Sequence, residues 1–332
     1  MATALALAAC GGDGGGAPSP TAPPATASTS PRDAALALCG ARPAPDDGAA
    51  VASDDLVEIS GLVHSNRYPG ILWAHNDSGD TARVFAIGAD GAALGTFTLQ
   101  GAHAVDWEDI AIGPGPLAGT DYLYLADIGD NAAARPEVIV YRVPEPGPGR
   151  GDDVTATLTG VERITLRYPD GAHDAETLLV DPATGEMVIV TKAVGAPSQI
   201  FRAAAVASPP PAETVLEPAG AVDFTALRSA AALPDDAPAL PRAVGYLPTG
   251  GDVSPDGGVV AIRTYGTIWV WAREPGTPLA GALAMPPAPV CEARAAIEPQ
   301  GEAVAIDADG SGYRTASEGA HPPLHHYRAG AP

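Results

Sequence analysis

Carboxylates recur along this chain in a frame that could hold a cation. Asp106-Trp-Glu108 and Asp174-Ala-Glu176 each place an acid, a spacer and a second acid before apolar residues two and four positions on. This period of two is typical of a β-strand. Looser copies begin at three further acids, Glu58, Asp252 and Glu302. Oxygen ligands in such number favour a hard divalent cation, calcium above all.

The spacing of these acids predicts the fold. Five units, each opened by an acid, begin at intervals of 50, 68, 76 and 50 residues and continue into short strand patterns separated by turn residues. Radial β repeats have this signature. A solenoid would not require the two ends to meet, and a β-sandwich would not repeat an acid at the start of each unit. We predict an all-β fold, a β-propeller with five four-stranded blades, or six if residues 203–251 contain a degenerate blade.

The innermost strand of each propeller blade lines the axial channel, so acids at equivalent strand starts would form a ring at one mouth. Ionised carboxylates so close together disfavour one another's charge unless something compensates them. A divalent cation is the simplest compensation, with eight predicted ligands: Glu58, Asp106, Glu108, Asp127, Asp174, Glu176, Asp252 and Glu302. The alternative is structural, with the acids bonding backbone N–H groups of the next blade and locking the ring.

Three other motifs have simpler interpretations. His75–Asp80 and Asp127–Asn131 are rich in oxygen ligands, but Asn, Asp and Gly are also ordinary turn formers. Asp307–Gly310 begins like an EF-hand loop and Glu318 is its twelfth residue, but the flanking segments predict strands, so we expect a hairpin turn. No catalytic residue is assigned, because the sequence shows no Gly-x-Ser-x-Gly motif and no Cys–His pairing.

Segments outside the repeat predict how the ring closes. Residues 32–39 predict a short helix, and residues 49–57 could supply an outer strand to the blade that starts at Glu302. Cys39 and Cys291 fall on either side of that seam, so we predict a disulfide between them; two unrelated buried thiols are the alternative. Residues 155–166 predict a strand broken at Gly160, and residues 224–233 a helix.

Charge excludes some partners. The chain has 332 residues, 46% of them hydrophobic, with 40 acids against 18 bases and a net charge of −22. Nucleic acid and anionic membrane surfaces are therefore excluded as partners, whereas metal cations and basic ligands fit, as does a purely solubilising role for the charge. We expect a monomer.

The N-terminus resembles an export signal. Leu7-Ala-Ala-Cys10 is similar to a bacterial lipobox, although the apolar run is short and lacks a preceding basic segment, which suggests a start further upstream. Residues 11–38 predict a flexible Gly/Pro/Ser/Thr/Ala-rich tether, and residues 39–332 a single propeller domain. This division predicts a protein outside the cytoplasm that touches the lipid bilayer only through a lipid on Cys10.

Several short motifs together resemble one family. They are Glu-x-Ser-Gly-Leu at 58–62, Asp-Trp-Glu-Asp-Ile at 106–110, Gly-Asp-Asn at 129–131, Asp-Ala-Glu-Thr-Leu at 174–178 and Pro-Gln-Gly-Glu-Ala at 299–303. This combination is similar to a group of actinobacterial secreted propeller lipoproteins of unassigned function. More distantly, the acids resemble those of phytase-like and regucalcin/gluconolactonase-like propellers, which hold calcium or another divalent metal and in some members hydrolyse phosphate esters or lactones. This chain departs from them because it has few bases for gripping phosphate, chiefly Lys192 and Arg263.

Two functions follow from these expectations. The first is a cell-surface or secreted lipoprotein that binds a small ligand or an extracellular protein, with a divalent cation in its acidic channel. The second is a metal-dependent hydrolase, a phosphoesterase, esterase or lactonase, that uses the same site. A hydrolase needs an open coordination position at the channel mouth with a base within reach, whereas a structural cation occupies a closed site.

Overall fold

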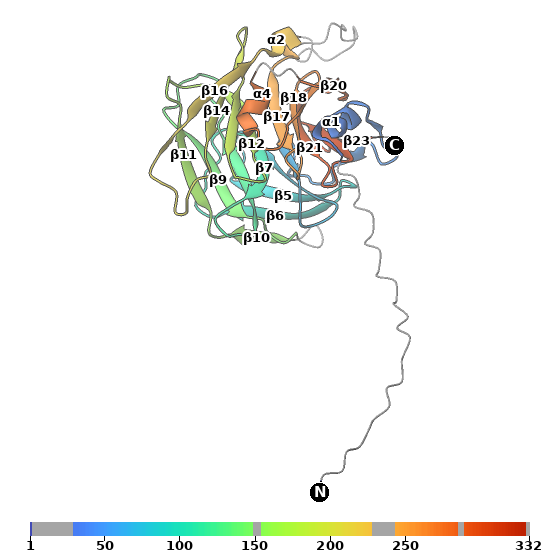
Figure 1. Ribbon diagram of the computed structural model, residues 1–332, viewed down its shortest axis with the longest axis horizontal. Helices are drawn as coiled ribbons and strands as arrows, with labels where there is room; N and C mark the ends of the chain where they lie inside the picture. The colour runs from blue at the N-terminus through green and yellow to red at the C-terminus, as the bar shows by residue number, and fades with distance from the viewer. Residues whose placement is uncertain (2–28, 149–153, 228–242, 285–288, 330–332) are drawn as a thin grey trace.

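A computed structural model describes residue 1 and residues 29–148, 154–227, 243–284 and 289–329 of this chain. Their strands form five sheets, each with an antiparallel core, arranged as a five-bladed β-propeller. In Figure 1 the inner strands β7, β12, β17 and β21 lie near the centre, and β10, β11 and β16 lie toward the periphery. The predicted all-β propeller is confirmed, with five blades.

The first three blades follow one another along the chain. Blade 1 consists of β3 (Ile59–His64), β4 (Ile71–Asn76), β5 (Arg83–Gly88) and β6 (Ala93–Leu99). Blade 2 consists of β7 (Trp107–Pro114), β8 (Asp121–Asp127), β9 (Val138–Pro144) and β11 (Glu162–Arg167). Blade 3 consists of β12 (Ala175–Val180), β13 (Met187–Thr191), β14 (Ser198–Ala203) and β16 (Glu217–Val222).

The last two blades include the closing segment. Blade 4 consists of β17 (Pro248–Val253), β18 (Val259–Thr264), β19 (Ile268–Ala272) and β20 (Cys291–Ala293). Blade 5 consists of β21 (Gly301–Ile306), β22 (Gly312–Ser317) and β23 (Pro323–Arg328), against which β1 (Arg42–Pro43) and β2 (Ala49–Ala50) pair. The described helices are α1 (Pro31–Cys39), α2 (Phe224–Leu227) and α4 (Leu279–Leu283).

The two long intervals between repeats have different explanations. The expected strand at 155–166 is divided at Gly160, whose φ of 73° breaks the extended backbone. Its first half, β10 (Thr155–Leu158), pairs parallel with β6 of blade 1, while its second half is β11 of blade 2. Between residues 203 and 251 the chain supplies β16 to blade 3, and the part of this interval that the structure describes forms no sixth sheet. Residues 228–233 of the expected helix lie outside the described residues.

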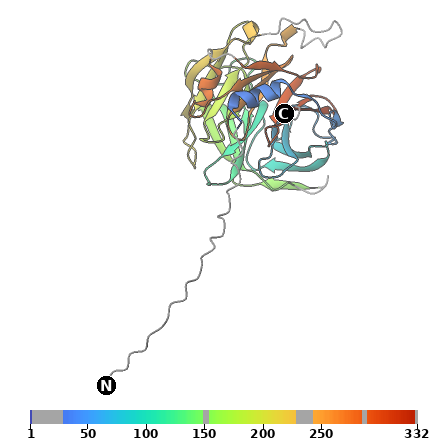
Figure 2. The same cartoon turned by 45° about the vertical axis from the view of Figure 1, so that its right-hand side comes forward.

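The N-terminal segment closes the ring. Both β1 and β2 pair antiparallel with β23, so the start of the chain completes the last blade. Helix α1, blue in Figures 1 and 2, lies beside the orange strands of blade 4 in both views. A disulfide joins Cys39 at the end of this helix to Cys291 in β20, with Cα atoms 6.0 Å apart. The closing strand and the disulfide were both predicted, although the strand is shorter than residues 49–57.

Hydrophobic packing is divided among five clusters around the ring. Each of five clusters of buried apolar side chains lies between two neighbouring blades, including the cluster between blades 5 and 1. Period-two alternation explains this division, because successive residues of one strand face opposite neighbours. Among the described helices, none is long and apolar enough to cross a membrane.

Candidate functional site

Each blade carries a β-bulge near the start of its inner strand. The register shifts by one residue at the same place in all five sheets, and the bulged residues are Ser60, Glu108, Glu176, Thr249 and Glu302. A bulge redirects its side chain away from the regular alternation. Three of the five repeat positions therefore present a glutamate at one mouth of the channel.

The bulge positions show that the sequence repeat was aligned on the wrong residue in blades 1 and 4. Glu58 precedes β3 and is exposed, and the bulged position of that blade belongs to Ser60. Asp252 lies three residues beyond the bulge at Thr249, and its buried carboxylate accepts hydrogen bonds from the backbone N–H groups of Val253 (2.8 Å) and Ile306 (2.7 Å). The expected ring of five equivalent acids is wrong for these two blades, because a bulge leaves no mark in the pattern of apolar residues.

Some acids do lock the ring, as the structural alternative predicted. Asp252 links β17 to β21 through the N–H group of Ile306. Asp109 is fully buried, and one of its oxygens accepts from the N–H groups of Leu178 (2.9 Å) in β12 and Gly251 (3.1 Å) in β17. Burial raises the pKa of Asp109 well above its usual range despite these bonds. One carboxyl thus joins the inner strands of blades 2, 3 and 4.

The residue that directly follows the second strand of a blade lies at the same channel mouth as the bulged residues. The first residue after the second strand is Asp77 in blade 1, Lys192 in blade 3, Tyr265 in blade 4 and Glu318 in blade 5. The backbone N–H of each donates to the carbonyl of the residue just before the inner strand, at 2.9 to 3.3 Å. This shared bond explains why four such different side chains reach the same mouth of the channel.

Two groups of carboxylates result, and they share one member. Ligand oxygens of Asp77, Asp106 and Glu108 lie within 4.8 Å of one another, as do those of Asp77, Glu302 and Glu318. Sequence reasoning predicted Asp106, Glu108 and Glu302 as ligands, but it interpreted Asp77 as a turn residue and considered Glu318 only as the twelfth residue of a rejected EF-hand loop. Their common place after a second strand was the signal that could have found them.

The remaining predicted ligands have other partners. Asp127 is paired with Arg135 at 2.9 Å. Asp174 accepts from the backbone N–H of Asp130 at 2.9 Å. Glu176 contacts the ammonium of Lys192 through Oε1. These three acids surround the two groups and add to the negative potential of the channel mouth.

Crowding and burial disfavour the ionised forms of these acids. Burial, with Asp77 and Asp174 nearby, raises the pKa of Asp106 to about 6. Burial and Asp77 raise the pKa of Glu318 to about 7. Burial and Glu176 raise the pKa of both Glu108 and Glu302 well above their usual range. At neutral pH the site therefore holds protons unless a cation replaces them.

One cation is built into the chain. Lys192 bonds both Glu176 and the hydroxyl of Tyr265, the latter at 2.9 Å. Burial opposes its charge, but Glu176 and Tyr265 outweigh that effect and raise the pKa of Lys192. Burial still raises the pKa of Glu176 to about 8, because Lys192 offsets only part of the desolvation.

The donor set fits a hard divalent cation. All five members of the two groups offer carboxylate oxygens, and neither group contains His or Cys. Glu302 is 4% exposed, yet its Oε2 has no hydrogen-bond partner. A Cβ added to Gly129 would stand 2.0 Å from Oε1 of Glu108 and 2.5 Å from Oδ2 of Asp106, so a glycine leaves this space to the carboxylates. Oxygen-only ligands and an unpartnered buried oxygen are what a calcium-type site requires.

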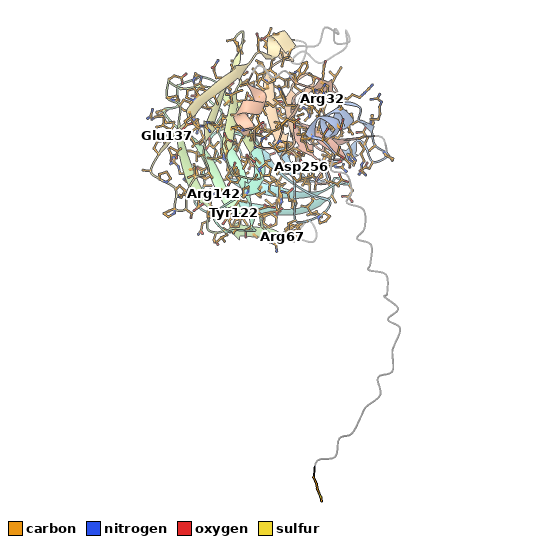
Figure 3. All side chains as sticks on the ribbon, in the orientation of Figure 1. Arg32, Arg67, Tyr122, Glu137, Arg142 and Asp256 are labelled. Atoms are coloured by element: carbon orange, nitrogen blue, oxygen red, sulfur yellow. A yellow bond between two sulfur atoms is a disulfide. The ribbon has the colours of Figure 1, made fainter. Side chains whose placement is uncertain are left out.

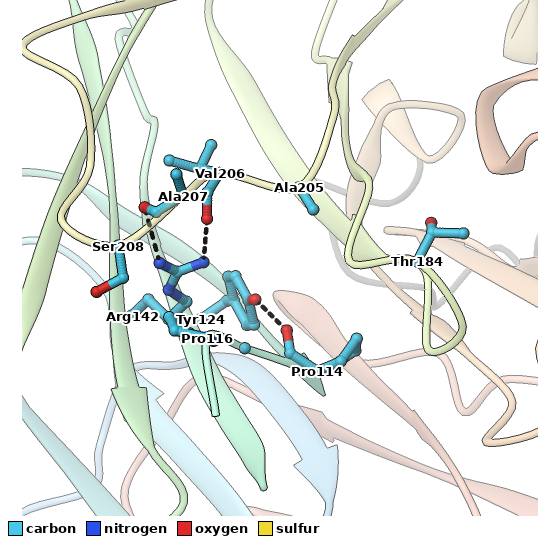
Figure 4. Close-up of a pocket in the computed structure, with 10 residues that line it drawn as sticks. Pro114, Pro116, Tyr124, Arg142, Thr184, Ala205, Val206, Ala207 and Ser208 are labelled. Atoms are coloured by element: carbon cyan, nitrogen blue, oxygen red, sulfur yellow. Dashed lines mark hydrogen bonds between the residues drawn. The ribbon is translucent and has the colours of Figure 1, made fainter. Parts of the chain in front are cut away.

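A separate pocket of about 340 Å³ lies between blades 2 and 3. Its charged group, Arg142, is labelled beside Tyr122 in Figure 3. In Figure 4 the guanidinium points at the carbonyls of Val206 and Ala207, and it also pairs with Glu162 at 2.6 Å. Because Arg142 is fully engaged by the protein, this pocket offers no charged group to a ligand.

Comparisons with known proteins find distant structural neighbours of this fold. No protein-family model matches the chain, and no curated protein matches it either. Among solved structures, a proposed 6-phosphogluconolactonase from Bacteroides uniformis has 13% identity and a TM-score of 0.36, over 82% of this chain and 72% of that one. A gluconolactonase from Xanthomonas campestris has 13% identity and a TM-score of 0.38, over 78% of this chain and 69% of that one. We take no functional argument from either likeness.

Proposed function

We propose that this protein is a propeller whose channel mouth holds a divalent cation, calcium first, and uses it to bind a ligand outside the cytoplasm. One observation carries the proposal: oxygens of Asp77, Asp106 and Glu108, from two different blades, come within 4.8 Å of one another. Ionised carboxylates do not gather so closely without a positive charge between them. Asp77 and Asp106 are half-buried, so a cation held here keeps a side open to solvent.

That open side favours ligand binding over a purely structural cation. A calcium ion takes six to eight oxygen ligands, and the group supplies three carboxylates, so further positions would be filled by water or by oxygens of a ligand. The ligand would be a small molecule or an extracellular protein. The sequence supports display at the cell surface through a lipid on Cys10, which lies outside the described residues.

The same open side supports a second candidate, a hydrolase of phosphoesters, esters or lactones. A bound divalent cation would polarise the substrate oxygen. Glu318 stands half-buried at the mouth, where its carboxylate can hold a proton next to the open face. Binding remains the primary proposal, because the sequence shows no motif for nucleophilic catalysis such as Gly-x-Ser-x-Gly.

Metal analysis and thermal melting test the proposal together. We expect purified protein to carry calcium, and EDTA to lower its melting temperature, because a ligand that binds only the folded state stabilises it. Asp106→Asn and Glu108→Gln should reduce the EDTA effect, and Glu137→Gln, a surface acid paired with Arg163, should preserve it in full. A melting temperature that EDTA leaves unchanged in the wild type would refute a loaded site. A screen of phosphate esters, carboxylic esters and lactones, with and without EDTA, then separates hydrolase from binding module.

The lipid anchor has its own test. Mass spectrometry of protein from a bacterial host should find Cys10 as the modified N-terminus, and Cys10→Ser should leave the membrane fraction. A mature chain that retains residues 1–9, or a Cys10→Ser form that stays equally attached, would remove the anchor from the proposal.

A further inference from the structure

Blades 3 and 5 use the same two repeat positions in opposite ways. In blade 3 the bulged Glu176 contacts Lys192, the first residue after the second strand. In blade 5 the bulged Glu302 faces Glu318 at that same position. Blade 3 therefore pairs an acid with a base, whereas blade 5 places two acids next to each other.

The acid pair of blade 5 is not balanced by the protein. Tyr265 reaches Oε1 of Glu302 at only 3.4 Å, and Oε2 of Glu302 is buried without a hydrogen-bond partner. Lys192 is already committed to Glu176 and Tyr265. A buried carboxylate oxygen that no donor satisfies costs free energy unless a ligand supplies the missing interaction.

The number of carboxylate charges at the channel mouth also favours a second cation. The two groups contain five carboxylates, so a single divalent cation would leave three negative charges, and two cations would leave one. Asp77 belongs to both groups and has two oxygens with which to serve two ions. Its placement in blade 1, whose bulge is the uncharged Ser60, leaves it free to lie between the acids of blades 2 and 5.

We propose that a second hard divalent cation binds between Asp77, Glu302 and Glu318, so that Asp77 bridges two ions at the channel mouth. This inference rests on the proposed function, because the first ion is the one held by Asp77, Asp106 and Glu108. The second ion replaces in blade 5 the positive charge that Lys192 provides in blade 3. Carboxylate oxygens alone, without nitrogen or sulfur ligands, select calcium or a similar hard cation.

Counting bound calcium in matched variants tests the second site. The full chain, stripped with EDTA, is dialysed against CaCl₂ near neutral pH and its metal content measured by mass spectrometry. We expect two calcium ions per chain in the wild type and in the surface control Glu137→Gln, and one in Glu318→Gln, Glu302→Gln and Asp106→Asn. Asp77→Asn should lose both ions or weaken them at least tenfold.

A lysine substitution serves as a control for variants that lose calcium only because they fail to fold. Glu318→Lys gives blade 5 the acid–base pair of blade 3, so this variant should fold, bind at most one ion and depend less on calcium for its melting temperature. One ion in the wild type, unchanged in Glu318→Gln, would overturn the second site while leaving the proposed function intact. Two ions that persist in both Glu318 variants would overturn it as well. No bound ion in the wild type would refute the second site and the proposed function together.

Discussion

Removing the cation should make the stability of this protein fall as the pH rises. The acids at the channel mouth have raised pKa values in the folded chain, so the chelated native state keeps protons that the unfolded chain releases. Where the folded state binds more protons than the unfolded state, the free energy of unfolding decreases with pH. The decrease should begin above pH 4, where the unfolded carboxyls ionise, and continue to about pH 8, where the folded ones have done so.

Two half-buried acids set a lower bound on this effect. The pKa of Asp106 rises from 3.8 to about 6 and that of Glu318 from 4.5 to about 7, through burial and the proximity of Asp77. At about 1.4 kcal/mol per unit, two such shifts amount to about 6 kcal/mol at full weight. Solvent screens both groups, so we halve this and expect a loss of about 3 kcal/mol between pH 4 and pH 8, of which about 2 kcal/mol falls between pH 5 and pH 8.

Urea unfolding at several pH values, with EDTA or with calcium, measures the loss. Calcium should remove most of it, because the ion takes the place of the protons. The seam between blades 5 and 1 adds its own pH dependence through His326, whose pKa is raised by Asp307 and Asp46 against the effect of burial. The contribution of His326 is the same with and without calcium. The difference between the two pH dependences therefore reports on the acids at the channel mouth. A chelated protein as stable at pH 8 as at pH 5 would show that the channel-mouth acids do not hold extra protons in the folded chain.

Three further changes probe the scaffold. Lys192→Met should cost about 3–5 kcal/mol in urea unfolding because it leaves Glu176 buried without its partner, and Lys192→Arg should recover part of the loss. Asp109→Ala should cost about 2–5 kcal/mol by leaving backbone N–H groups of two blades unpaired; a loss below 1 kcal/mol would show that Asp109 is no lock. Reducing the Cys39–Cys291 disulfide, which spans 252 residues, should cost up to about 5 kcal/mol, and an unchanged melting temperature after reduction would contradict its role in closure.

The propeller could be predicted because each repeat shows a regular pattern of apolar residues in the sequence. In β7 and β12 apolar residues stand two and four positions after the bulged glutamate, and the turns between strands carry Gly, Pro and Asp, so both period and unit are visible in the sequence. The closing disulfide followed from topology, since Cys39 and Cys291 border the two ends that any ring must join.

The site could be predicted only in part, because its geometry depends on one-residue shifts. A bulge turns Glu108 and Glu302 toward the channel mouth, while Asp252, three positions past its bulge, turns to a backbone N–H group instead. Asp77 and Glu318 lie in turns by local composition, and only the backbone bond that follows each second strand brings them to the acids. Such contacts between blades are absent from any local pattern.

The most direct test of the central claim is an anomalous difference map from a crystal of this protein soaked in calcium or manganese. We expect a peak about 2.3–2.6 Å from carboxylate oxygens of Asp77, Asp106 and Glu108 for calcium. A map without a peak at these residues, with their carboxyls hydrogen-bonded to one another instead, would contradict it.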